Sequence, residues 1–328
     1  MSVIAAPANR SNTSIWVAFT LLIVGTLGAY YVVGLTQALL FLIGGALGMT
    51  LYHASFGFTS SWRVFITERR GRGLRAQMIM LALAVLLFFP ALGAGELFGN
   101  PVKGNVSPVS MSVMIGAFIF GIGMQLGGGC ASGTLYTVGS GSMRMIITLV
   151  FFCTGSLIAT THLDWWFNLP HLAPISVVHS LGVAPALVIN FILFALIAFA
   201  TIYFEKKRHG NLEVEPKSQH QGWKRFIRGP WPLVWAGILL TLLNFATLSL
   251  AGRPWGVTSA LAVWAAKTAS FAGIDVASWS YWQQPANAKA LSESLWFDIT
   301  SMMNFGIMLG ALLAAGLAGK FAPNFNIP

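Results

Sequence analysis

One stretch of the sequence combines a thiol with an unusual run of glycines. Cys130 follows three consecutive glycines in the segment GMQLGGGCASGTLYTVGSG. Each glycine costs a helix roughly 1 kcal/mol relative to alanine, so the run predicts that the preceding helix opens there. Open backbone presents N–H groups that attract anions, and a cysteine S–H is a soft, weak hydrogen-bond donor. The candidate binding residues of this glycine–cysteine motif are Gly127, Gly128, Gly129, Cys130, Ser132 and Gly133.

A purely structural explanation of the same motif stays open. The spacing of Gly123 and Gly127 permits close helix packing, and a buried cysteine can act as a small apolar filler. We expect the chain to remain irregular from Ser132 to Gly141, where serine, threonine and glycine recur. Irregular backbone is tolerated at membrane depth only when it is buried in protein or lines a wet cavity.

Two further segments carry candidate residues and resemble each other. FGFTSSW at 56–62 and WGVTSAL at 255–261 share the order aromatic, glycine, apolar residue, threonine, serine, and each has an arginine beside it. A histidine inside an apolar run is a functional hypothesis by default, although it can also bond a neighbouring carbonyl. The first arginine, Arg63, either attracts anions or only sets topology. The candidate binding residues outside the glycine–cysteine motif are His53, Gly57, Thr59, Arg253, Gly256 and Thr258.

The composition places these motifs in a membrane. Of the 328 residues, 56% are hydrophobic and only 9% are charged, and the mean hydropathy is +0.72. Such a chain cannot cover a water-facing surface, so we predict an all-α polytopic membrane protein. The net charge of +10 gathers in short segments between apolar runs, which argues against a nucleic-acid partner.

Apolar runs long enough to cross a bilayer predict about nine transmembrane or half-spanning helices. Two of these runs are short and contain glycine, so they are candidates for half-helices that enter and turn back: 37–55 and 256–272. The complete set of expected spans is 15–35, 37–55, 76–95, 110–128, 143–161, 183–204, 231–251, 256–272 and 296–318.

Charged loops set the expected orientation and division of the chain. Basic residues concentrate in 62–75 and 205–229, whereas the loops 96–109 and 162–182 are nearly uncharged. Positively charged loops stay in the cytoplasm, so we expect the N-terminus there as well, in a bacterial inner membrane. The polar linker 205–230 separates a first half, 1–204, from a second half, 231–328.

The likeness of 56–62 and 255–261 suggests that the two halves are repeats with broken helices, as is common in secondary transporters. Cys130 lies 73 residues after Gly57, and the same offset from Gly256 falls near position 329. We therefore expect the second half to lack its own glycine–cysteine motif and its last helices.

Nothing in the sequence points to an enzyme or a metal site. No Walker motif, catalytic triad or pair of carboxylates is present, so we expect no catalysis and no cofactor. Three histidines, at 162, 171 and 179, are spaced by nine and eight residues, which fits no compact metal motif. The two cysteines give no disulfide framework.

The segments GMQLGGGCASGTLY, SFGFTSSWR and GRPWGVTSA resemble those of the YeeE/YedE membrane family, and the resemblance extends over about 40–318. The resemblance implies sulfur transport, and the characterised members of the family take up thiosulfate. The resemblance implies an hourglass of helices and inward-dipping loops, in which cysteines pass thiosulfate along by S–H···S contacts. Cys130 would then be the central thiol.

The sequence departs from the family pattern at two places. Gly57 stands where the family often has cysteine, and a second cysteine motif is absent from the sequence. Either Cys130 acts alone in a glycine-lined pathway for thiosulfate, or the cargo is another sulfur or selenium species. A further alternative is a membrane thiol carrier that delivers sulfur to a cytoplasmic sulfurtransferase-like partner. The last alternative is a fragment with only a scaffolding role.

Overall fold

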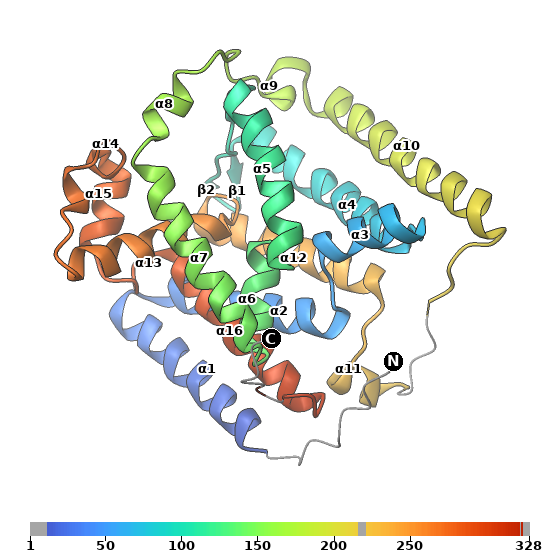
Figure 1. Ribbon diagram of the computed structural model, residues 1–328, viewed down its shortest axis with the longest axis horizontal. Coiled ribbons are helices and arrows are strands. Elements are labelled where there is room, and N and C mark those ends of the chain that lie inside the picture. The colour runs from blue at the N-terminus through green and yellow to red at the C-terminus, as the bar shows by residue number, and fades with distance from the viewer. Residues whose placement is uncertain (1–11, 216–220, 322, 324–328) are drawn as a thin grey trace.

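The computed structural model describes residues 12–215, 221–321 and 323 (Figure 1). Its elements are almost all helical, with one two-stranded hairpin. They are α1 (Thr13–Val32), α2 (Leu35–Ala54), α3 (Phe58–Glu68), α4 (Arg72–Ala94), β1 (Glu96–Leu97), β2 (Asn100–Pro101), α5 (Met111–Gly127), α6 (Ala131–Gly139), α7 (Met143–Thr160), α8 (Leu163–Phe167), α9 (Val177–Leu181), α10 (Val183–His209), α11 (Trp223–Arg228), α12 (Leu233–Ala251), α13 (Val257–Phe271), the 3-10 turn η1 (Val276–Ser278), α14 (Ser280–Gln283), α15 (Pro285–Ser292) and α16 (Ile299–Leu317).

The described residues contain eight helical segments long and apolar enough to cross a membrane. Every expected span corresponds to a helix, which confirms the all-α membrane class. The half-helix alternative is wrong for α2, because Leu35–Ala54 is one unbroken helix of 20 residues. The other short run forms α13, whose 15 residues are fewer than a bilayer crossing needs.

Glycines bring α2 and α16 into backbone contact at the centre of the bundle. A Cβ atom at Gly44 or Gly48 would overlap the backbone of Met303 or Ile307 in α16. A Cβ atom at Gly310 would overlap the backbone of Gly45 in return. Pairs of small residues four positions apart allow this close approach and gain packing energy along two helices. The glycines of 37–55 therefore serve helix packing.

The same central helix holds α6. A Cβ atom at Gly139 would overlap the backbone of Met308 in α16. Figure 1 shows α2, α6 and α16 crossing in the middle of the bundle, with α1 and α10 at opposite edges.

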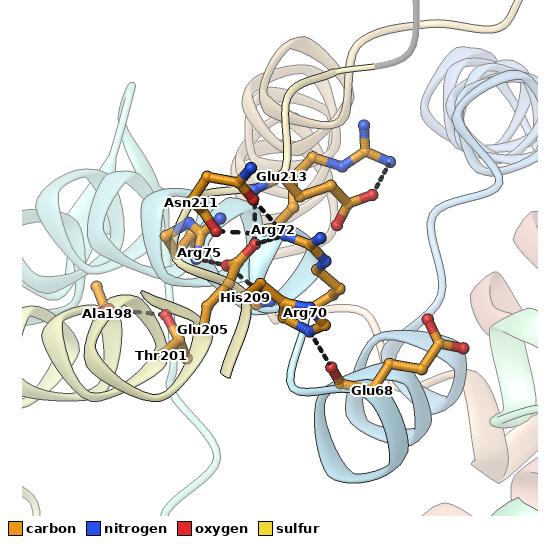
Figure 2. Close-up of polar contacts among 11 residues, drawn as sticks. Glu68, Arg70, Arg72, Arg75, Ala198, Thr201, Glu205, His209, Asn211 and Glu213 are labelled. Atoms are coloured by element: carbon orange, nitrogen blue, oxygen red, sulfur yellow. Dashed lines mark hydrogen bonds and ion pairs between the residues drawn. The ribbon is translucent and has the colours of Figure 1, made fainter. Parts of the chain in front are cut away.

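The two basic segments meet at one end of the bundle, around the fully buried carboxylate of Glu205 (Figure 2). Its oxygens accept from Arg75 Nη1 at 2.6 Å and from Arg70 Nη1 at 3.3 Å. They also accept from the backbone N–H groups of Gly71 at 3.1 Å and Glu213 at 2.6 Å. A buried charge is tolerated only when it is paired and hydrogen-bonded in this way. The cluster fastens α10 to the turn between α3 and α4.

The two nearly uncharged loops meet at another place. Met111 N donates to Pro170 O at 3.0 Å, and Leu172 N donates to Val109 O at 2.9 Å. Lys103 N also donates to Gly252 O at 2.8 Å, which joins the first loop to the end of α12. The two basic segments, expected on one side of the membrane, thus contact each other. The two neutral loops, expected on the other side, also contact each other.

The glycine contact predicts opposite effects for two Gly→Ala substitutions. Gly310→Ala should destabilise the protein by about 1–3 kcal/mol, because the added methyl group meets the backbone of α2 and neither helix can yield. Gly121→Ala in α5 is the control, since its Cβ atom meets nothing within 4 Å and alanine favours a helix. Thermal unfolding in detergent measures both. Equal melting temperatures for the two variants would contradict the contact.

The buried carboxylate predicts a second difference in stability. Glu205→Gln should cost about 3 kcal/mol, because Arg70 and Arg75 then face a neutral amide. Glu293→Gln is the matched control, since its pair with Lys289 at 3.8 Å is exposed and should contribute less than about 1 kcal/mol. Melting temperatures of both variants check the expectation, and a small loss for Glu205→Gln would overturn it.

Candidate functional site

The chain opens at the glycine–cysteine motif as expected. Helix α5 ends at Gly127, and Gly128 adopts φ 78°, a left-handed conformation that side chains rarely accept. Cys130 is the N-cap residue of α6, and its carbonyl accepts the first helical bond, from Thr134 N at 2.8 Å. The thiol therefore stands at the junction between two helices, at the positive end of α6.

The expectation of irregular chain from Ser132 to Gly141 is wrong, because residues 131–139 form α6. Ala131, Gly133 and Leu135 are buried, and α6 packs against α16 and α7. Packing of one face outweighs the poor helix propensity of these residues. The half-buried thiol of Cys130 lies with its Sγ 3.5 Å from Ser132 Oγ.

The cation Arg144, which the sequence motifs do not include, lies beside the glycine–cysteine motif. A guanidinium nitrogen of Arg144, in the first turn of α7, lies 3.7 Å from the position that a Cβ atom of Gly128 would occupy. The side chain is exposed and forms no ion pair within the described part of the chain. One signal could have identified it: no other lysine or arginine occurs between Lys103 and Lys206.

The first-half motif forms a second break, between α2 and α3. Gly57 is the N-cap residue of α3, and its carbonyl accepts from Ser60 Oγ at 3.1 Å, Ser61 Oγ at 2.8 Å and Gln77 Nε2 at 3.4 Å. Thr59 is buried, and its hydroxyl has no hydrogen-bond partner among the described residues.

Helix α3 is tied to the end of α5, close to the thiol. Arg63 Nε donates to Gln125 Oε1 at 3.0 Å, and its Nη2 donates to Gln125 O at 3.1 Å. Gln125 Nε2 in turn donates to Thr59 O at 3.4 Å. Arg63 therefore does more than bias the topology, because it joins the first-half motif to the helix that leads into Cys130. An amide inside an apolar stretch, Gln125, was the available signal.

The second-half motif shares some local hydrogen bonds with the first. Gly256 is the N-cap residue of α13, and its carbonyl accepts from Ser259 Oγ at 2.9 Å. The next carbonyl, of Val257, accepts from the buried amide of Asn304 at 3.0 Å, as Gly57 accepts from the buried amide of Gln77. Thr258 is exposed.

Arg253 lies just before this break and is exposed. It lines a cavity of about 440 Å³ together with Ser259, Lys289 and Asp298. Arg253 forms no ion pair with any residue that the structure describes, whereas Lys289 is paired with Glu293. The cavity thus holds one unpaired cation next to the start of α13.

The three helices that follow the breaks begin around one core. Their first residues, Phe58 of α3, Ala131 of α6 and Val257 of α13, all belong to or pack against the same hydrophobic cluster. Among the described residues, none of these three helices has a side-chain cap at its N-terminus. The first N–H groups of a helix have no partner within the helix and can bind an anion, although in α13 Ser259 N already donates to Gly256 O at 3.2 Å.

His53 has different surroundings from those of the glycine–cysteine motif. It is buried near the end of α2, where its carbonyl accepts from Trp231 N at 2.9 Å and its ring faces the Trp231 ring at 5.1 Å. Its Nε2 has no hydrogen-bond partner in the described chain. The structure places this histidine against the segment that leads into α12.

Comparison with known proteins relates the sequence to one family. The sequence pattern of the family described as sulphur transport matches residues 53–328. The thiosulfate transporter TsuA of Spirochaeta thermophila is 28% identical over 303 residues, which cover 85% of this chain and 78% of that protein. TsuA of Escherichia coli is 29% identical over 115 residues, covering 35% of this chain and 32% of that protein. The matched region includes all three breaks, and on this ground the chain belongs to the YeeE/YedE sulphur transport family of multi-pass membrane proteins.

Proposed function

We propose that the protein is a permease for a small sulfur-containing anion, that thiosulfate is its substrate, and that Cys130 contacts the substrate directly. The observation that carries the proposal is the position of the thiol at the N-terminus of α6, with Arg144 beside the glycines that precede it. The names of the two relatives support thiosulfate as the substrate.

This arrangement suits thiosulfate because its two ends differ chemically. The oxygen-bearing end carries negative charge that backbone N–H groups and a guanidinium can bind. The terminal sulfur is a soft acceptor for the S–H of Cys130. Gly127, Gly128 and Gly129 have no side chains, so the anion can approach the backbone closely.

The second motif supplies the outer entrance in this proposal. Arg253 attracts the anion into the cavity that it lines together with Ser259, next to Gly256 and Thr258 at the start of α13. The similar hydrogen bonds at Gly57 and Gly256 support a two-fold repeat, with α3 and α13 as short helices that follow inward-dipping loops. Thr59 and Gly57 line the corresponding place in the first half.

The charge distribution supports the orientation. The basic end around Glu205 faces the cytoplasm by the positive-inside rule, which places the neutral loops outside a bacterial inner membrane. The expectation of a cytoplasmic N-terminus concerns residues 1–11, which lie outside the described part of the chain. A sulfurtransferase-like protein at the basic end is a candidate recipient of the imported sulfur.

Substitution of the two cysteines tests the role of Cys130. In sulfur-limited cells, Cys130→Ala should reduce uptake of sulfur-labelled thiosulfate at least tenfold, because the soft contact to the terminal sulfur is lost. Arg144→Gln should reduce uptake as well, through the loss of charge at the same place. Cys153→Ala, on the packed face of α7, is the matched control and should transport normally.

Each outcome of this assay is informative. Normal uptake by an inserted Cys130→Ala protein would refute the contact. No uptake by the unsubstituted protein, together with uptake of another labelled sulfur or selenium anion, would refute thiosulfate as the substrate. A stable sulfur adduct on Cys130 in the intact mass, without uptake, would favour the thiol carrier instead.

The proposed entrance predicts a change in apparent affinity. Arg253→Gln should raise the thiosulfate concentration for half-maximal uptake several-fold, with little change in the maximal rate, since the arginine acts before the pathway proper. The effect should shrink as ionic strength rises. Lys103→Gln, an exposed cation of the neighbouring loop, is the control. Equal effects of both substitutions would argue against a specific capture site.

A further inference from the structure

A short helix at the base of α12 presents aromatic and basic side chains together. Helix α11, with the sequence WKRFIR, is exposed over most of its length: Trp223 is 74% and Phe226 is 53% exposed. Lys224 and Arg228 are also exposed and form no ion pair in the parts of the chain that the structure describes. Helices of this composition lie in the interface between lipid headgroups and acyl chains.

An apolar groove of about 450 Å³ runs from α11 along α12. Phe226, Trp231, Trp235, Ile238 and Leu242 line it, and Arg225 is the one charged residue at its edge. The lining along α12 extends from Pro232 to Leu242, which is about 15 Å at 1.5 Å per residue. This length equals half of a hydrocarbon core of about 30 Å, which is the thickness of one leaflet.

Two contacts fix α11 at the mouth of the groove. Arg225 pairs with Glu215 at 2.7 Å, and its Nε donates to Pro230 O at 3.0 Å. Its charge is therefore neutralised within the protein. Lys224 and Arg228 do not line the groove, but they belong to the same short helix as Arg225 and Phe226 and form no ion pair among the described residues.

We propose that this groove binds an anionic glycerophospholipid of the leaflet at the basic end of the protein. One acyl chain lies along Trp235, Ile238 and Leu242, and the phosphate lies beside Lys224 and Arg228. The two unpaired cations of α11 favour an anionic headgroup beside this helix, and the apolar lining and length of the groove favour a lipid chain. This site does not depend on the proposed transport function.

A stack of rings connects this site to the first-half break. Trp223 stacks on Phe226 at 5.2 Å between centroids, Phe226 stacks on Trp231 at 5.3 Å, and Trp231 faces His53 at 5.1 Å. Trp231 N also donates to His53 O, four residues before Gly57. A bound lipid that orders α11 therefore stabilises the end of α2.

Native mass spectrometry of the full chain in detergent tests the site. The unsubstituted protein should retain phosphatidylglycerol more strongly than phosphatidylcholine. The double variant Lys224→Gln/Arg228→Gln should bind phosphatidylglycerol about tenfold or more weakly, because two cations near the phosphate are lost. Lys206→Gln/Lys207→Gln removes the same charge from the end of α10 and should bind normally. Ile238→Trp, which fills the groove and leaves the charge unchanged, should also weaken binding.

Three results would overturn the proposal. Equal retention of the two lipids would show that no anionic headgroup is recognised. Equal losses in the two lysine and arginine double variants would show a diffuse charge effect. Displacement of phosphatidylglycerol by millimolar inorganic phosphate, without an effect of Ile238→Trp, would show a site for free phosphate instead of a lipid.

Discussion

The backbone contact between α2 and α16 is the constraint on which the rest of the structure depends. Lipid tails are as apolar as the side chains they replace, so helices in a bilayer associate through close packing and not through the exclusion of water. Gly44, Gly48 and Gly310 supply that packing by allowing the two backbones to touch. Because Gly139 of α6 rests on the same helix, the position of Cys130 is fixed by the axis of α16.

Around this axis, polar side chains secure the backbone where helices break. Gln77, Gln125 and Asn304 each donate an amide hydrogen to a main-chain carbonyl at or beside a break. An unsatisfied carbonyl in an apolar environment costs free energy, so these amides make the breaks tolerable at depth. The breaks are thus built features of the fold, held from neighbouring helices.

The sequence was sufficient for features that depend on local chemistry. The spans follow from apolar runs, and the opening before Cys130 follows from three glycines in a row. It was insufficient where distant contacts decide the outcome. Helix α6 exists because α16 and α7 cover it, and the partner of Arg63 is 62 residues away, at Gln125. The glycines in 37–55 predict a helix break when the segment is considered alone. Their packing role depends on a facing helix that lies far along the chain, since Gly44 meets Met303 and Gly48 meets Ile307.

The carbonyl groups at the two short helices have a consequence for charge discrimination. A sodium or potassium ion that leaves water must replace its hydration shell with oxygen atoms. At Gly57 and Val257 those oxygens already accept hydrogen bonds from Ser60, Ser61, Gln77 and Asn304. A dehydrating cation would find few free oxygen ligands there, whereas a dehydrating anion would meet the first two N–H groups of each short helix, for which the structure shows no backbone partner. The donors that stabilise each break thereby leave few carbonyl oxygens free to coordinate a cation.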